Sequence, residues 1–277
     1  MYNRFYIDFE FVEGKIPQQV CGRNIPQWLS KPNNTIQPIS VGIVSGDGRE
    51  YYAIFKEFNL KEAWNRFDIK QSGFTNSGKD PAYEKVYWIR ENVLKPIFDE
   101  LFYRFWNEPD YLGFVDMKFD FDNLKYLINK YGKTSKQIAD EIKSFIYEPF
   151  LVNGSDNIEW VGNKPLDIEF YGYVSSYDFV QLCWLYNKLI DLPKGFPNIC
   201  TDLKQIRNEK EALLIKEFPI GITTTELNMA ACFELSSNNV KRVSLKLHPD
   251  YPKSTNAHHS LDDAKFNKQL HEFLMNI

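Results

Sequence analysis

The sequence predicts an α/β protein with a mixed sheet flanked by helices, and three observations predict it. Segment 3–11 alternates apolar and polar residues, which is the pattern of a strand. Segments 39–44 and 50–55 flank an Asp47-Gly48 turn signal and read as a hairpin. Segment 168–174 alternates again and runs directly into a helical pattern. Strands therefore come first, and strands and helices alternate afterwards.

The two faces of the first strand differ in character. In an extended chain successive side chains leave opposite faces, so the residues separate into two sets. The apolar set is Phe5, Ile7, Phe9 and Phe11, and the other set is Tyr6, Asp8 and Glu10. Segment 12–35, which holds Gly, Pro and Asn, is expected to be a loop before the hairpin.

Helices are expected where apolar residues recur at helical spacing. Asp80-Pro81 is a good helix start, and the pattern continues to Pro96. Further helices are expected over 135–146, from 176 to 190, from 202 onward and over 261–277. Segment 68–81 and most of 218–257 read as loops, 97–132 shows no clear pattern, and 148–166 reads as an excursion with a small hairpin.

The length of 277 residues and the absence of repeats, low-complexity tracts or an obvious linker predict a single domain over 1–277. Insertions are expected near 12–35, 97–132 and 148–166. The net charge of −4 argues against a protein that coats nucleic acid non-specifically. It leaves room for an enzyme whose carboxylates bind metal beside a local basic rim.

The cysteines and the N-terminal segment indicate the metal chemistry and the cellular location that can be expected of the protein. Cys21, Cys183, Cys200 and Cys232 form no CxxC pair, so a zinc knuckle is not expected. The N-terminal segment is charged from the start, and no apolar run is long enough for a signal peptide or a membrane span. We expect a cytoplasmic protein.

Five residues stand at positions where they could form one metal site. Asp8 and Glu10 lie two apart on the first strand, so their side chains share a face with Cα atoms about 7 Å apart. Asp178 lies in the first turn of the helix after strand 168–174, and His258 and Asp263 stand at the start of the last helix. Each residue alone has an ordinary explanation. Asp8 and Glu10 could lie on the solvent-exposed face of a strand, Asp178 could be stabilised by the helix dipole, and His258 could be a surface histidine.

The histidine at the last helix could act as a general base, because its ordinary pKa near 6.5 suits proton transfer at neutral pH. Two histidines compete for this role. His259 lies four residues before Asp263, so the base could be shifted by one position from His258.

Together these motifs resemble the DEDDh-type 3′–5′ exonucleases of the ribonuclease T-like superfamily. The family's DxE, its later Asp and its HxAxxD motif correspond to Asp8-Phe9-Glu10, to Asp178, and to the segment from His258 to Asp263. When Asp263 is aligned with the last residue of the HxAxxD motif, the histidine of the motif falls on His258, and Ser260 replaces the usual Ala. The blocks ISVGIVSGDGREYYAIFKEF, KVYWIRENVLKPI and GYVSSYDFVQLCWLYNKL resemble the small bacterial and phage 3′–5′ exoribonucleases.

The resemblance implies a ribonuclease H-like fold and removal of nucleoside 5′-monophosphates from the 3′ end of single-stranded RNA. Asp8, Glu10, Asp178 and Asp263 are then expected to bind two Mg²⁺ or Mn²⁺ ions, with His258 as general base. Phe11 is expected either to pack on the terminal nucleotide or to belong to the core. A homodimer is expected from the family alone.

Three alternatives stay open. A single-stranded DNA exonuclease would have the same fold and site, because the sequence reveals no contact that would recognise a 2′-OH. A catalytically silent nucleic-acid-binding module would have no need of four carboxylates near phosphates. A paired-carboxylate glycosidase would leave His258 and two of the acids unexplained.

Overall fold

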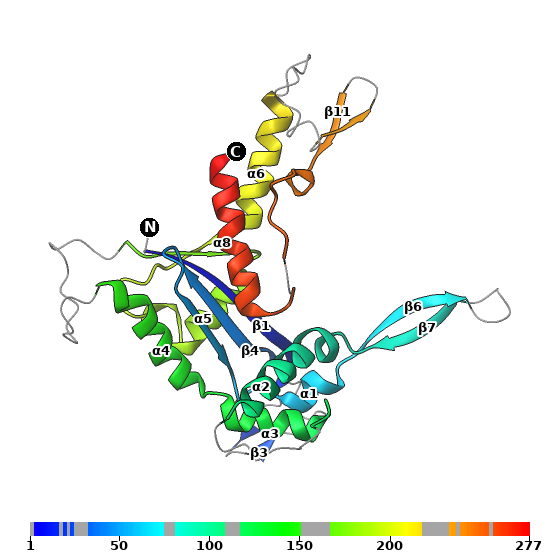
Figure 1. Ribbon diagram of the computed structural model, residues 1–277, viewed down its shortest axis with the longest axis vertical. Coiled ribbons are helices and arrows are strands. Elements are labelled where there is room, and N and C mark those ends of the chain that lie inside the picture. The colour runs from blue at the N-terminus through cyan, green and yellow to red at the C-terminus, as the bar shows by residue number, and fades with distance from the viewer. Residues whose placement is uncertain are drawn as a thin grey trace.

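A five-stranded mixed sheet forms the centre of the protein, as the computed structural model shows (Figure 1). The structure describes residues 3–16, 19–20, 23–24, 33–74, 81–108, 117–150, 167–217, 233–236, 239–254 and 257–277. The strand order is β5-β4-β1-β8-β9. The strands are β1 (Arg4–Ile16), β4 (Asn33–Ser45), β5 (Glu50–Ile54), β8 (Glu169–Gly172) and β9 (Cys200–Asp202). β4 runs antiparallel to β1 and β5, whereas β8 runs parallel to β1 and β9, so the predicted α/β class with a mixed sheet is confirmed.

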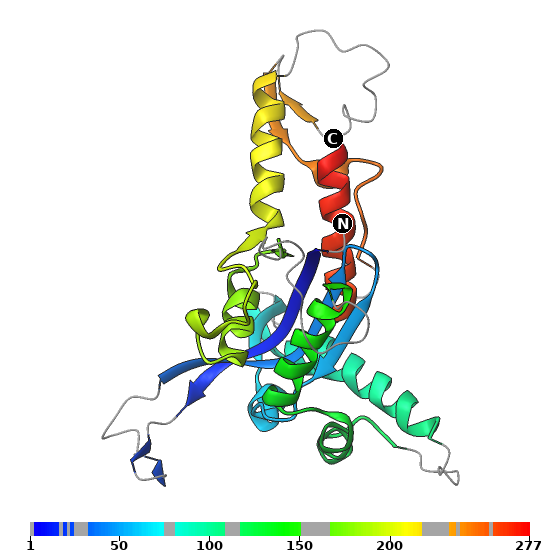
Figure 2. The same cartoon turned by 90° about the vertical axis from the view of Figure 1, so that its left-hand side faces the viewer.

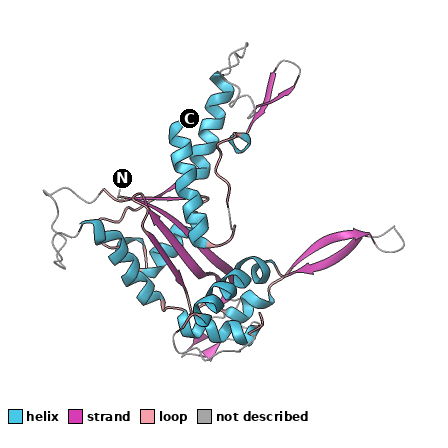
Figure 3. Cartoon of the chain, in the orientation of Figure 1, coloured by secondary structure: helices cyan, strands magenta, loops and turns pink. Residues whose placement is uncertain are grey.

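Helices cover the sheet and extend beyond it (Figure 3). The helix α8 (Ser260–Asn276) packs chiefly on β1 and β4. Beside β1 and β5 lie α5 (Ser176–Leu185) and α4 (Ser135–Tyr147). The remaining helices are α1 (Leu60–Asn65), α2 (Lys95–Trp106), α3 (Phe121–Tyr131) and α6 (Leu203–Glu217), and short 3-10 turns span Glu148–Phe150, Leu189–Asp191 and Leu245–Leu247.

Three two-stranded ribbons stand apart from the central sheet. They pair β2 (Gln19–Val20) with β3 (Arg23–Asn24), β6 (Asp68–Phe74) with β7 (Pro81–Val86), and β10 (Phe233–Ser236) with β11 (Asn239–Val243). The β6–β7 ribbon projects from the body near α1 and α2 in Figure 1. Figure 2 shows α6 and the β10–β11 ribbon rising beyond the sheet on the side of α8.

Buried apolar residues form two clusters that belong to different faces of the sheet. The larger contains Phe5, Ile7 and Phe9 of β1 together with residues of α2, α3, α4 and α5. The smaller contains Tyr6, Tyr171, Leu203, Leu245, Leu270 and Leu274, and so joins β1 and β8 to α8 and α6. The alternation of side chains predicted for β1 is therefore confirmed. Tyr6 is buried under α8, although its face of the strand was expected to be exposed to solvent.

The first strand is longer than the sequence predicts. The segment 12–35 was expected to be a loop, but β1 continues to Ile16 and β4 begins at Asn33, paired throughout. The register shifts between Glu10 and Phe11, and beyond this point Val12 is buried while Phe11 is only half-buried. The irregularity ends the simple alternation, because the core face passes from odd to even positions.

The prediction of a helix over residues 80–96 is wrong at both ends. Pro81–Val86 is the strand β7, whose partner β6 supplies the hydrogen bonds that a helix would make internally. The helix that follows passes through Pro96 instead of ending there. A π-helical turn over Arg90–Leu94 precedes α2, with the Lys95 N–H bonded to the carbonyl of Arg90. Pro96 then falls in the first turn of α2, where a missing N–H costs little.

Other predicted elements agree more closely. The helix expected from Ser135 is α4, although Thr134 is its capping residue and forms a capping box with Gln137. The segment without a clear pattern holds α2 and α3, and Asp120 caps the latter. Residues 151–166, where a small hairpin was expected, lie outside the described residues.

Within the described part of the chain, every helix is too short or too polar to cross a bilayer.

Candidate active site

The unequal lengths of two strands leave an open edge beside the first two acidic residues. β8 pairs with β1 only over Arg4–Tyr6, and among the described residues no strand pairs with this side of β1 from Ile7 onward. Asp8 and Glu10 follow on the same face, as predicted, and each residue is half-buried. The open edge makes room for the start of α5.

The third acidic residue comes from α5. A turn after β8 leads into this helix, and Ser175 takes the capping position without making a side-chain cap bond. Asp178 is only 5% exposed. Its carboxylate accepts a hydrogen bond from the backbone N–H of Phe9 at 3.0 Å. This bond fixes Asp178 against β1 between Asp8 and Glu10.

The start of α8 is fixed by close backbone packing on β4. A Cβ at Gly42 would lie 2.3 Å from the carbonyl carbon of Ser260, so only glycine allows this approach. The buried Ser260 hydroxyl donates to the Ser40 hydroxyl at 3.0 Å. Two turns further on, the Asn267 amide donates to the carbonyl of Ile7 at 3.1 Å. Ser260 therefore has a structural partner on β4.

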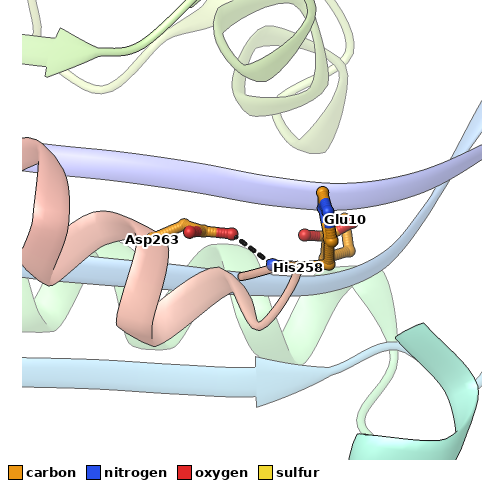
Figure 4. A group of neighbouring side chains, drawn as sticks. All are labelled: Glu10, His258 and Asp263. Atoms are coloured by element: carbon orange, nitrogen blue, oxygen red, sulfur yellow. Dashed lines mark hydrogen bonds between the residues drawn. The ribbon is translucent and has the colours of Figure 1, made fainter. Parts of the chain in front are cut away.

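His258 and Asp263 meet Glu10 at this end of α8 (Figure 4). The side-chain ligand atoms of the three residues lie within 4.8 Å of one another. The backbone of His258 has φ of 71°, a left-handed conformation that is costly for a residue with a side chain. Its N–H donates to the Asp263 carboxylate at 2.8 Å, and its ring stands edge-on to Trp88 at 4.5 Å. These contacts stabilise the unusual backbone and aim the imidazole at Glu10.

The neighbouring histidine faces elsewhere. A ring nitrogen of His259 lies 3.2 Å from the carboxylate of Glu100 on α2, and its other nitrogen lies 3.4 Å from Asp262. The ring also lies over Tyr52 of β5, with centroids 4.7 Å apart. The structure thus groups His258, and not His259, with two of the predicted acids.

Burial raises the pKa of all four carboxyl groups, and the charges of neighbouring acids raise it further. Burial raises the pKa of Asp8 well above its usual range, and the charges of Asp178, Glu10 and Asp263 raise it further. Burial and the same neighbours raise the pKa of Glu10 to about 8. Burial raises the pKa of Asp178 to about 7, although the hydrogen bond from Phe9 opposes the shift. For Asp263 burial raises the pKa, against the hydrogen bond from His258.

This arrangement fits divalent cations. Among the described residues, neither Lys nor Arg forms an ion pair with Asp8, Glu10, Asp178 or Asp263. Buried carboxylates without a cation are costly, because like charges repel in a weakly polar environment. Carboxylate oxygens are the ligands that Mg²⁺ and Mn²⁺ prefer. The donor set therefore matches hard divalent ions.

Aromatic side chains border the carboxylates. Phe11, just past the register shift, stands edge-on to Tyr177 with ring centroids 5.5 Å apart. Trp88 packs against His258 and lines a hollow together with Phe11. Gly42, Trp88 and Tyr177 are not among the site residues that the sequence predicts. Only Tyr177 carried a local signal, since it precedes Asp178 directly, whereas Gly42 and Trp88 reach the site through contacts between distant segments.

Comparison with known protein families gives no match. Two curated proteins of Mycobacterium tuberculosis, from strains CDC 1551 / Oshkosh and ATCC 25618 / H37Rv, are similar to this chain. Both are named 3′-5′ exoribonuclease, and each is 22% identical over 207 residues, which cover 75% of this chain and 75% of the relative.

Proposed function

We propose that this protein is a metal-dependent 3′–5′ exoribonuclease that releases nucleoside 5′-monophosphates from single-stranded 3′ ends. The observation that carries the proposal is the convergence of Asp8, Glu10, Asp178 and Asp263 without a cation from the described part of the chain. The DEDDh motif order and the similarity to proteins named 3′-5′ exoribonuclease support the same reaction and the choice of RNA.

The four carboxylates are proposed as ligands of two Mg²⁺ or Mn²⁺ ions. When bound, these ions offset the carboxylate charge and stabilise the negative charge that develops on the phosphodiester. The scaffold suits this role because each acid is attached to a fixed element: Asp8 and Glu10 to β1, Asp178 to the start of α5, and Asp263 to α8. Rigid attachment keeps the acids in place while substrate enters.

His258 is proposed as the general base. Its ring lies beside Glu10 and Asp263, so it can accept the proton of a water that attacks the terminal phosphodiester. The O–P bond to the 3′ oxygen of the preceding nucleotide then breaks, and the terminal nucleotide leaves as a 5′-monophosphate. His259 is held by Glu100 and is proposed to anchor α8 instead.

Phe11 is proposed to contact the terminal nucleotide together with Tyr177. Phe11 is half-buried and follows Glu10 directly in the sequence. Its ring partner Tyr177 is exposed and precedes Asp178 directly. Aromatic faces bind bases by stacking with little sequence preference. Such a contact suits an exonuclease that accepts different 3′ nucleotides.

The direct test uses single-stranded RNA and DNA labelled at the 5′ or the 3′ end, incubated with Mg²⁺, Mn²⁺ or EDTA. We expect stepwise shortening of 5′-labelled RNA and early release of mononucleotide from 3′-labelled RNA, both abolished by EDTA. Asp8→Ala should abolish shortening, and His258→Ala should reduce it strongly.

Three results would reject the proposal in different ways. Faster shortening of DNA than of RNA would make the protein a DNA exonuclease. Binding without shortening in either metal would indicate a silent binding module. Full activity of Asp8→Ala would show that the carboxylates are not the catalytic centre.

A further inference from the structure

A chain of three adjoining hollows leads away from the carboxylates. The first has a volume of about 610 Å³ and is lined by the β1–β4 ladder, α1 and one side of α5. Tyr177 and Trp184 of α5 both line it. They are seven residues apart, so they lie on one side of the helix two turns from each other. Tyr177 is 47% exposed and Trp184 52%, which makes them an aromatic stripe that begins beside Asp178.

The second hollow, of about 150 Å³, shares Ile36 and Trp184 with the first. The third, of about 370 Å³, shares Phe58 with the second and lies between α1 and α3. Figure 1 shows these two helices next to each other at the end of the sheet away from α6. The shared lining residues place the hollows next to one another, and we call the series the path.

The charge of the path changes along its length. The first hollow carries both signs, with Glu13 and Glu62 beside Lys15 and Arg66. The third carries one sign. It is lined by Lys56, Lys61 and Lys125 with polar and apolar residues, namely Phe58, Asn59, Leu60, Phe121, Ile128 and Asn129, and no carboxylate lines it.

Glu57, which lies in the sequence between Lys56 and Phe58 of this lysine pocket, is already engaged. Glu57 lines the second hollow, and its carboxylate accepts hydrogen bonds of 2.7 Å from the backbone N–H and the hydroxyl of Ser135. These bonds lower the pKa of Glu57 and direct its charge to the start of α4. The three lysines are exposed and available to an anion.

We propose that this path binds the single-stranded nucleic acid upstream of the 3′ end that is being cut. The terminal nucleotide contacts Tyr177, an upstream base stacks on Trp184, and phosphates several nucleotides away from the cut bind Lys56, Lys61 and Lys125. The inference rests on the proposed exonuclease function, because it places the scissile end at the four carboxylates. It also accounts for nucleic-acid binding by an acidic protein, since the basic charge is local.

The proposal predicts that affinity depends on RNA length through the lysine pocket. Fluorescence anisotropy in EDTA would compare RNA of about 4 and about 16 nucleotides on the wild type and on a K56Q/K61Q/K125Q variant. We expect the long RNA to bind the variant at least about 10-fold more weakly and the short RNA to bind both proteins alike. The slope of log affinity against log salt should fall by about 2, because each phosphate contact on a single strand contributes about 0.7.

Two further variants separate the path from general charge and fold effects. A K246Q/K253Q/K268Q variant changes the same charge on and near α8, and its length dependence should match that of the wild type. Trp184→Ala should weaken binding of the long RNA by about 10-fold through lost stacking, with the short RNA unaffected. Equal binding of long RNA by the wild type and the K56Q/K61Q/K125Q variant, or equal losses in both lysine variants, would overturn the path.

Failure of the path and failure of the proposed function give different results. If the wild type shortens RNA but binds it without length dependence, the path is wrong and the exonuclease stands. If length-dependent, lysine-dependent binding is found without shortening in Mg²⁺ or Mn²⁺, the path stands and the catalytic proposal falls.

Discussion

The two faces of β1 use alternate residues of the same strand for opposite purposes. On one face Phe5, Ile7 and Phe9 are fully buried in the larger apolar cluster. On the other face Tyr6 packs under α8, and Asp8 and Glu10 follow it into the carboxylate site. Apolar burial stabilises the fold on the first face, whereas on the second face like charges raise one another's pKa at a cost to stability.

The difference shows how the register of one strand serves both needs. A slip of one residue would place both acids in the apolar cluster, so burial of the aromatic and aliphatic side chains strongly favours the functional register. Burial of the apolar face of β1 thus fixes the position of the acidic face. Substitutions on the two faces are expected to separate stability from activity.

The largest effect is expected for Asp178→Asn. The amide oxygen can still accept the hydrogen bond from Phe9, while the charge that would bind a cation is gone. Loss of several kcal/mol of transition-state stabilisation corresponds to a fall in kcat of about 1,000-fold. The melting temperature in EDTA should rise, because repulsion among buried acids is relieved. A lower melting temperature together with retained activity would contradict the contrast between the faces.

Next comes the matched pair His258→Ala and His259→Ala. Loss of a general base lowers kcat by about 100-fold or more, so His258→Ala should fall in that range. His259→Ala removes contacts with Glu100 and Tyr52 and should lower the melting temperature, with kcat within about 5-fold of the wild type. Initial rates on 3′-labelled RNA measure both variants. The reverse ranking would move the base to His259.

Gly42→Ala tests the contact that positions α8. The added Cβ would collide with the backbone of Ser260 and Leu261, so the helix start must move. Overpacking of this kind costs about 1–3 kcal/mol of unfolding free energy, and displacement of His258 and Asp263 should reduce activity as well. Urea denaturation and initial rates would be compared with those of Gly73→Ala in β6, where the added atom meets no neighbour within 4 Å but the backbone φ of 135° is strained for alanine, so this variant controls for a loss of stability away from α8. Unchanged activity of Gly42→Ala would show that α8 is not fixed by this approach.

The metal-free protein should lose stability as the pH rises. The pKa of Glu10 is about 8 in the folded protein against an ordinary value of 4.5, so folding favours its protonated form. That contribution is complete below pH 4.5 and disappears as the pH rises through about 8. In EDTA, the wild type should melt about 4 °C below Glu10→Gln at pH 8 and close to it at pH 4.5. A difference that does not change with pH would contradict the assigned pKa shift.

The smallest effect is expected on the apolar face. Ile7→Val removes one methylene from a fully buried side chain and should cost about 0.5–1.5 kcal/mol of unfolding free energy. The carboxylates are untouched, so kcat at a temperature where both proteins are folded should stay at the wild-type value. A marked loss of kcat would show that the two faces are not independent.

The parts of the fold that local patterns control could be predicted from the sequence. The alternation in β1, the Asp47-Gly48 turn and the apolar spacing of α4 and α8 are local features, and each appears in the structure. The prediction of a helix over 80–96 was wrong because the observed structure of this segment depends on pairing with a separate strand and on an unusual helical turn. Pairing with β6 makes Pro81–Val86 a strand, and a π-helical turn allows α2 to pass Pro96.

The candidate site divides in the same way. Asp8, Glu10, Asp178, His258 and Asp263 could be named because their spacing and order carry the pattern. Their roles stay predictions that the experiments above address. The contacts that hold them could not be foreseen, since the close approach of Gly42 to Ser260 and the pairing of His259 with Glu100 join segments more than 150 residues apart.

The docking of α8 on β4 also has a consequence for the order of events during synthesis. His258 and Asp263 leave the ribosome about 250 residues after Asp8 and Glu10. Contacts of such long range form late, because the intervening chain must be made and closed first. A nascent chain therefore cannot assemble the proposed carboxylate site until residue 263 has emerged and its helix has docked.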